Sequence, residues 1–96
     1  MLERREELVP VTASAIAKGK TVEYDASEDA YKECATAANA CGVLLEAVEA
    51  SQDPAYALVG FAGEYEDSEV TFPVSEADEK AALRKCGIFV TERTDA

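Results

Sequence analysis

Three cysteines carry the only reactive sulfur in this chain, and they are the first candidates for chemistry. Cys34, Cys41 and Cys86 lack the C-x-x-C spacing of zinc and redox motifs, and the sequence has no His to complete a zinc ligand set. A nucleophilic Cys needs a neighbour that lowers its pKa. Cys86 follows Arg84 and Lys85, but it falls at the predicted end of a helix, where the dipole disfavours a thiolate. We therefore expect three small, buried or half-buried structural residues.

Clustered acidic side chains could instead bind cations or act as catalytic carboxylate pairs. Two such clusters occur, at 25–29 and 64–69. Neither has the spaced oxygen ligands and central Gly of a calcium loop. Without His there is also no His-based triad or His general base. The glycines fit neither nucleotide-binding fingerprint. The sequence therefore predicts a protein that is not an enzyme and holds no cofactor or metal.

Twenty acidic and nine basic residues give the chain a formal net charge of −11. Such a surface repels nucleic-acid phosphates and anionic membranes, so we expect neither as a direct partner. No stretch approaches the roughly 20 consecutive apolar residues of a membrane helix, and we expect synthesis in a reducing cytosol. Solubility is the simplest reason for the charge. Mimicry of DNA phosphates is the sharper alternative.

The apolar residues can fill only a thin core. Of the 96 residues, 18 are Ala, which buries little area, and only 25 are large apolar side chains. Burial stabilises by roughly 25 cal/mol per Å² of apolar surface, so a thin core offsets little of the entropy lost on folding. Association with other subunits is the usual remedy, and we expect it here.

Alternating apolar and polar residues predict one mostly β domain. Strands are expected at 20–24, 30–34, 43–48, 56–62 and 88–90, with an extended segment at 70–74. Gly60 and Gly63 predict a bulge or a close backbone approach.

One short helix is predicted near the C-terminus, over about 76–86. Ser75 occupies the N-cap position with Asp78 three residues later, acidic residues fill the first turn, and basic residues fill the last. Gly87 follows at the position that favours a left-handed conformation. Local signals thus define both ends of this helix.

The first 19 residues are expected to form a flexible, extended N-terminal arm, with residues 20–96 as the single folded domain. Pro10 disfavours a helix in the arm and removes a backbone donor. Strand addition to a partner sheet suits such an alternating segment. The candidate contact residues are Val9, Pro10, Val11, Thr12 and Ala13.

The order of five motifs resembles that of a known family. They are a small-residue turn into an apolar strand, an aromatic-acidic stretch, an aromatic-Pro pair, a helix with an acidic start and an apolar terminal strand: 40–45, 64–67, 72–73, 76–83 and 87–90. From about Thr21 to Val90 the chain resembles the lambda-type bacteriophage head decoration proteins. Phe72 stands where a Trp is typical of that family.

The resemblance implies a β-clip-like fold with a small helical portion, and a structural task. Such proteins form trimers at local threefold positions on the outside of an expanded head. They bridge units of the major capsid protein and resist the pressure of packaged DNA, and the N-terminal arm extends a capsid-protein sheet. The chain would therefore be made in the host cytoplasm and reside on the virion exterior. Candidate trimer or capsid contacts are Tyr65, Phe72, Pro73 and Phe89.

Two other functions stay open at this point. The net charge of −11 suits an acidic inhibitor or DNA mimic that binds a basic protein. The three Cys and the many acids leave a thiol-dependent or metal-dependent enzyme as a third hypothesis.

Overall fold

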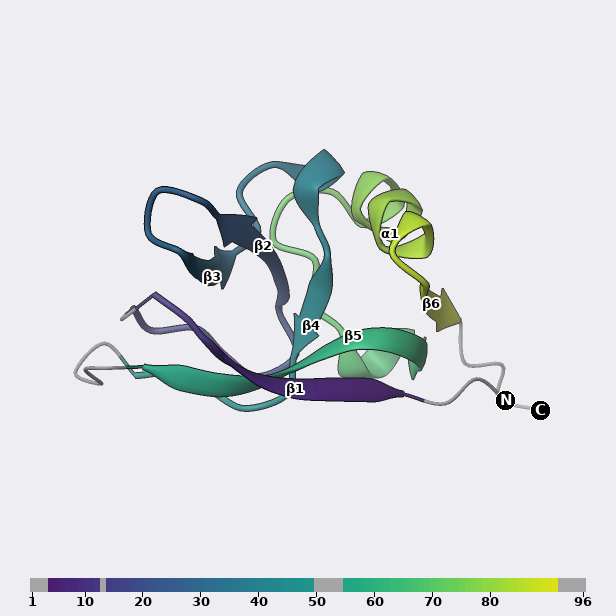
Figure 1. Ribbon diagram of the computed structural model, residues 1–96. Helices are drawn as coiled ribbons and strands as arrows, with labels where there is room; N and C mark the ends of the chain where they lie inside the picture. The colour runs from purple at the N-terminus through teal and green to yellow at the C-terminus, as the bar shows by residue number, and fades with distance from the viewer. Residues whose placement is uncertain (1–3, 13, 50–54, 92–96) are drawn as a thin grey trace.

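A computed structural model describes residues 4–12, 14–49 and 55–91 of the chain (Figure 1). The fold is mostly β with one α-helix near the C-terminus, as predicted. Its elements in chain order are β1 (Arg5–Pro10), β2 (Thr21–Asp25), β3 (Ala30–Glu33), the 3-10 turn η1 (Ala37–Asn39), β4 (Gly42–Leu44), β5 (Tyr56–Glu66), the 3-10 turn η2 (Asp67–Glu69), α1 (Glu76–Lys85) and β6 (Ile88–Thr91).

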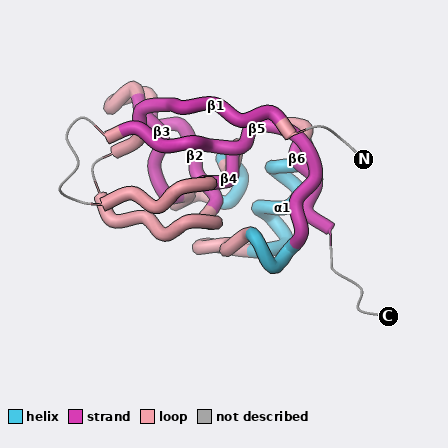
Figure 2. The backbone as a smooth tube through the Cα atoms, turned by 90° about the horizontal axis from the view of Figure 1, so that it is seen from below, coloured by secondary structure: helices cyan, strands magenta, loops and turns pink. Residues whose placement is uncertain are grey.

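The long strand β5 organises the sheet. The strand order is β1-β5-β4-β2-β3, with antiparallel pairing throughout this path. The far end of β5 pairs in parallel with β6. The hairpin of β2 and β3 lies at one end of the molecule and α1 with β6 at the other, and the view from below keeps them at opposite ends (Figure 2).

A bulge lies in β5 between the part that pairs with β1 and β4 and the part that pairs with β6. Glu6 lies opposite Gly60, but Arg5 lies opposite Ala62, so Phe61 is an extra residue in β5. A bulge bends a strand and increases its twist. Gly63, with a φ of 114°, follows directly. The irregularity predicted from the glycines is thus present, and it turns β5 towards β6.

The N-terminal segment differs from the separate arm predicted for residues 1–19. It is extended, but β1 pairs with β5 over its whole length, and Val11 bridges to Tyr31 of β3. The Thr12 N–H donates to the Tyr31 carbonyl at 2.8 Å. The sheet therefore curls until the end of β1 meets β3. The arm prediction failed because a segment with strand character pairs with any edge within reach, including one of its own chain.

Two clusters of buried side chains lie on the two faces of the sheet. The first, called the inner cluster, comprises Val11, Ile16, Val22, Leu44, Val48, Ala55, Ala57, Val59 and Phe61. The second, called the helix-side cluster, comprises Cys34, Ala40, Val43, Tyr65, Val70, Ala82, Leu83 and Ile88, with Leu45, Phe72 and Val90 against it. Successive strand residues point to opposite faces, which is why adjacent Val43 and Leu44 join different clusters. Each cluster is small, as the Ala-rich composition predicts.

The helix begins and ends close to its predicted bounds. Ser75 has the extended backbone of an N-cap residue, but its side chain makes no capping bond. Gly87 has a φ of 89°, which is the left-handed conformation predicted for it. The buried helix residues are Glu79, Ala82 and Leu83.

Other elements differ in extent from their predictions. The strand predicted at 43–48 is a three-residue strand, Gly42–Leu44, and Val48 forms an isolated bridge with Ile16. The extended 70–74 segment contains a single bridge, from Thr71 to Lys20. Between β3 and β4, the Ala-rich 35–40 stretch contains the short 3-10 turn η1.

Candidate functional site

The three thiols lie in different environments and form no disulfide. Cys34 is buried, Cys41 is half-buried and Cys86 is exposed, so the expected burial fails for Cys86. Burial, together with the negative charges of Glu79 and Glu23, raises the pKa of the Cys34 thiol to about 11. Cys34 therefore stays protonated at neutral pH, which is the opposite of what a nucleophile requires. Within 4–12, 14–49 and 55–91, no group of three or more Cys, Asp or Glu side chains is arranged to hold a metal ion.

Two buried carboxylates hold loops in place. Glu79 accepts hydrogen bonds from the N–H groups of Val74 (2.9 Å) and Ser75 (2.7 Å), and from the Thr21 hydroxyl. Its carboxylate therefore satisfies donors at the start of α1 and ties the helix to β2. Glu23 accepts in the same way from the backbone of residues 35 and 36. Sequence reasoning assigned Glu79 only to the helix dipole, since its backbone and β2 partners are set by the fold.

Tyr65, predicted as a contact residue, belongs to the interior. It is 1% exposed, so it cannot meet a capsid or a second subunit. The Arg4 guanidinium lies 4.1 Å from the centre of its ring. Its hydroxyl approaches Gly60 so closely that a Cβ there would lie 1.9 Å from the oxygen. Phe72, Pro73 and Phe89 are half-buried and keep part of their surface accessible.

The predicted contact residues of the arm divide between core and surface. Val11 is buried, Val9 and Thr12 are half-buried, and Pro10 is exposed. Ala13 lies outside the described residues. A partner could therefore reach only part of the predicted set without unfolding the edge of the sheet.

The outer edge of β1 presents free main-chain groups. Leu58 of β5 directs its N–H to the Glu46 carboxylate (2.8 Å), and its carbonyl accepts from the Leu45 N–H (2.8 Å). Leu8 lies opposite Leu58, so this is a non-hydrogen-bonded pair, and the N–H and carbonyl of Leu8 point away from β5. The same alternation applies to Glu6. At Pro10 the edge is no longer open, because Val11 bridges to Tyr31 and the Thr12 N–H donates to the Tyr31 carbonyl.

Exposed apolar side chains accompany this edge. Directly opposite residues of an antiparallel pair share a face, so Leu8 with Leu58 and Pro10 with Tyr56 lie on one side of the sheet. Leu8 is 66% and Tyr56 is 51% exposed. We call Leu8, Pro10, Tyr56 and Leu58 the apolar stripe. Sequence reasoning found Pro10 but missed Leu8, although its place in an edge strand and its size could have marked it.

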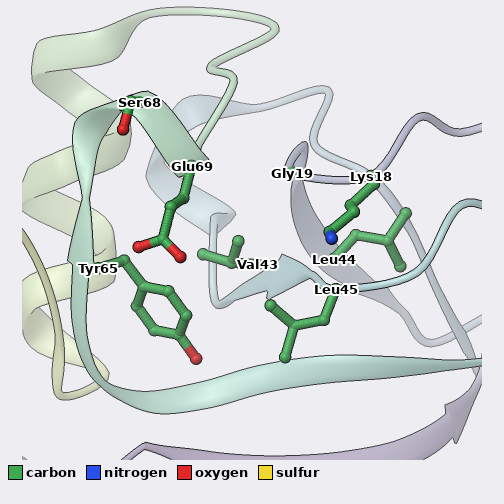
Figure 3. Close-up of a pocket in the computed structure, with 8 residues that line it drawn as sticks. All are labelled: Lys18, Gly19, Val43, Leu44, Leu45, Tyr65, Ser68 and Glu69. Carbon is green, nitrogen blue, oxygen red and sulfur yellow. The ribbon is translucent and has the colours of Figure 1, made fainter.

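A cavity of about 310 Å³ opens beside β4 and the end of β5 (Figure 3). Its lining residues are Lys18, Gly19, Val43, Leu44, Leu45, Tyr65, Ser68 and Glu69. Val43 and Leu45 point toward the Tyr65 ring from the opposite side. The cavity thus has apolar walls with charged groups at its rim, and sequence reasoning did not identify it.

The exposed acidic side chains come from many elements. They lie on β1, in the β2–β3 turn, after β4, at the end of β5, at η2 and on α1: Glu6, Glu7, Glu28, Asp29, Glu46, Glu49, Glu66, Glu69, Glu76 and Asp78. In Figure 1, β1 and the β2–β3 turn lie on different sides of the molecule. A DNA mimic requires charges spaced along one ridge, and this distribution does not favour one.

The surface features of the described chain are thus a strand edge, an apolar stripe and a cavity. Its one α-helix has ten residues, and no helix in the described part is long and apolar enough to span a bilayer. A scan against protein-family models found no matching family, and a search of curated proteins found no matching relative.

Proposed function

We propose that this chain is a phage head decoration protein that binds the outside of the expanded capsid as a trimer. One observation supports this above others. The motifs that resemble the lambda-type family are spread over 40–90 in the sequence, yet all five contribute side chains to or against the helix-side cluster. The resemblance therefore covers a packed structural unit rather than scattered surface positions.

The surface suits a role in binding rather than in chemistry. The most buried thiol is held protonated, and the two buried carboxylates are occupied by backbone donors. In contrast, Leu8 and Tyr56 of the apolar stripe stay largely exposed, and Leu8 directs its main-chain groups away from β5. A strand of the major capsid protein could add to β1, with main-chain bonds giving affinity and alternate side chains giving register.

Stabilisation of the shell then follows from mass action. A protein that binds only the assembled, expanded lattice lowers the free energy of that lattice relative to its dissociated parts. Three linked copies raise the effective concentration of each weak contact. Neither effect needs a reactive group.

The decisive measurement is binding to shells of the phage that encodes the protein. The purified protein should cosediment with expanded shells and not with unexpanded ones, in multiples of three copies per threefold position. Cosedimentation with neither kind of shell would refute the proposal.

A proline substitution tests the docking edge itself. Leu8→Pro removes the outward N–H of β1 and no bond to β5, so the fold should survive while shell binding falls. Leu8→Ala removes the side chain alone and is the matched control for the main-chain contribution. Unchanged shell binding by Leu8→Pro would show that the capsid docks elsewhere.

A further inference from the structure

Three leucine side chains form a row across the sheet that ends at the edge strand β1. Leu45 follows β4, and its N–H donates to the Leu58 carbonyl of β5 at 2.8 Å. Leu58 in turn lies opposite Leu8 of β1. Directly opposite residues share a face, and exposure grows from half-buried Leu45 and Leu58 to Leu8, which is 66% exposed. The row is therefore least covered at β1, the last strand of the sheet on this side.

The main chain of β1 is oriented to extend this row by one more strand. The N–H and carbonyl of Leu8 point away from β5, and those of Glu6 do the same by alternation. The edge closes beyond Val9, because Val11 bridges to Tyr31. The accessible segment is thus short, and a strand added to it would take its register from Leu8 and Glu6.

Two acidic side chains lie on the same segment. Glu6 shares the face of Leu8, and Glu7 shares the other face with Val9. Both carboxylates are exposed, and neither forms an ion pair with any residue of the described ranges. The edge therefore presents an apolar pair beside an acidic pair.

The two basic residues that precede this acidic pair contact other groups. Arg4 binds Glu69 at 2.7 Å. The Arg5 guanidinium lies 5.9 Å from the centre of the Phe61 ring. Cations that could pair with the acidic residues of the edge therefore have to come from a partner.

A second copy of β1 does not fit this edge. Alternation of the main-chain groups restricts symmetric antiparallel pairing of two β1 strands to registers centred on one residue. Centred on Arg5, Glu6 or Glu7, such a pair sets that charge opposite its own copy, and like charges directly opposite are destabilising. Centred on Leu8, it would need the edge at Pro10, which is closed.

We propose that β1 binds an antiparallel strand of a partner protein in which two apolar residues are followed by two basic ones. The apolar residues would lie opposite Val9 and Leu8, and the basic residues opposite Glu7 and Glu6. The residue opposite Leu8 would extend the leucine row. The net charge of −11 favours the approach of a basic segment. For the source of the strand, a segment of the major capsid protein, the inference rests on the proposed function.

Hexapeptides test the order and charge of the strand through amide chemical shifts of the full chain. Ac-Val-Val-Lys-Lys-Thr-Thr-NH₂ should give saturable shifts at 6–9 and 58. Ac-Lys-Lys-Val-Val-Thr-Thr-NH₂ has the same composition in the wrong order and should bind about tenfold more weakly. Ac-Val-Val-Glu-Glu-Thr-Thr-NH₂ should lose about as much, because opposite-charge pairs become like-charge pairs. Equal binding of the three peptides, or no saturable shift at millimolar concentrations of the first, overturns the proposal.

Backbone methylation of the first peptide tests the register. The N–H of its second Val faces the Leu8 carbonyl, so N-methylation there should abolish binding. The N–H of its first Lys points away from β1, so N-methylation there is the matched control and should leave the affinity within a fewfold of the parent peptide. Equal effects of the two methyl groups would contradict the register.

A charge swap in the protein tests the acidic pair. Glu6→Lys combined with Glu7→Lys should reverse the preference, so that the Glu-Glu peptide binds more tightly than the Lys-Lys peptide. Glu28→Lys combined with Asp78→Lys changes the net charge equally at exposed positions elsewhere and should keep the wild-type preference. An unreversed preference in the first variant contradicts the proposal. Shell cosedimentation without peptide selectivity would refute this inference alone, and peptide selectivity without cosedimentation would refute the capsid as the source of the strand.

Discussion

At the scale of single residues, two glycines show two different reasons for having no side chain. Gly60 lies under Tyr65, whose hydroxyl occupies the space that a Cβ would need. Gly87 has nothing within 4 Å of an added Cβ, but its φ of 89° is a conformation that L-residues adopt at a cost. Space limits the first and backbone conformation limits the second.

Alanine at each glycine should separate the two effects. Gly60→Ala is expected to lower the free energy of unfolding by about 2–3 kcal/mol, the cost of overpacking, and Gly87→Ala by about 1 kcal/mol. Urea denaturation measures both. Adding Tyr65→Phe should recover part of the stability that Gly60→Ala removes and none of the stability that Gly87→Ala removes. Equal recovery in both double variants would contradict the close contact between Gly60 and the Tyr65 hydroxyl.

The Glu79 carboxylate accepts the backbone N–H groups at the start of α1, so the stability of this end of the helix depends on Glu79. Glu79→Gln keeps the shape but places an NH₂ group among donors, so the free energy of unfolding should fall by about 1–3 kcal/mol. Asp78→Asn, one position earlier and exposed, is the control and should change it by less than about 0.5 kcal/mol. Urea denaturation measures both changes, and an equal loss in the two variants would show that the Glu79 carboxylate does not stabilise the start of α1.

Cys34 predicts a loss of stability at alkaline pH. Burial first, then Glu79 and Glu23, raise its pKa from 9.0 to about 11 in the folded chain. Between these values the unfolded thiol releases its proton while the folded one keeps it, so stability falls as the pH rises. Urea denaturation from pH 8 to 11 should show a smaller fall for Cys34→Ala than for the wild type. Identical curves would mean that the thiol ionises equally in both states.

At the scale of elements, β1 is the clearest case of a segment whose role changes with its surroundings. It was predicted as an arm that a partner orders, and the structure pairs it with β5 inside the same subunit. Val11 and Ile16, which follow it, are core residues. The N-terminal segment should therefore support folding as well as docking.

Deletion of residues 1–10 tests this consequence. It exposes one edge of β5 and uncovers the inner cluster beside Val9, so the midpoint of thermal unfolding should fall by at least several degrees. Circular dichroism follows the melt. Leu8→Ser, at an exposed position of the same strand, should leave it within about a degree or two. An unchanged midpoint in the deletion would restore the separate arm.

At the scale of the whole molecule, the core is divided and the shape is long. The described chain measures 44 × 21 × 20 Å along its principal axes, and the two small clusters lie on opposite faces of one sheet. A thin core of this kind leaves apolar surface such as the apolar stripe uncovered. Association would bury it.

Such association predicts a stability that depends on concentration. If subunits assemble, the midpoint of thermal unfolding rises with protein concentration, because only the folded chain associates. Scans over a hundredfold range of concentration, with sedimentation equilibrium at the same points, would detect this. A midpoint independent of concentration, with a monomer mass throughout, would confine trimer formation to the capsid surface.

The sequence by itself determined the features that depend on near neighbours along the chain. The helix at Glu76–Lys85, its left-handed Gly87, the strand character of most segments and the irregularity near Gly60 all follow from side-chain spacing, charge and backbone freedom. These effects act between residues a few positions apart, so they can be predicted from the order of residues along the chain. The small share of large apolar residues likewise set the size of the core in advance.

Only the tertiary structure decided which partner each segment meets. Arg4 reaches Glu69 across 65 positions and Thr21 reaches Glu79 across 58. Pairings of that span place β1 in its own sheet, bury Tyr65 and enclose the cavity beside β4. An edge strand or an aromatic ring can satisfy several neighbours equally well in isolation. The free energy of the whole packed chain decides which neighbour is used, and this cannot be predicted from a local sequence pattern.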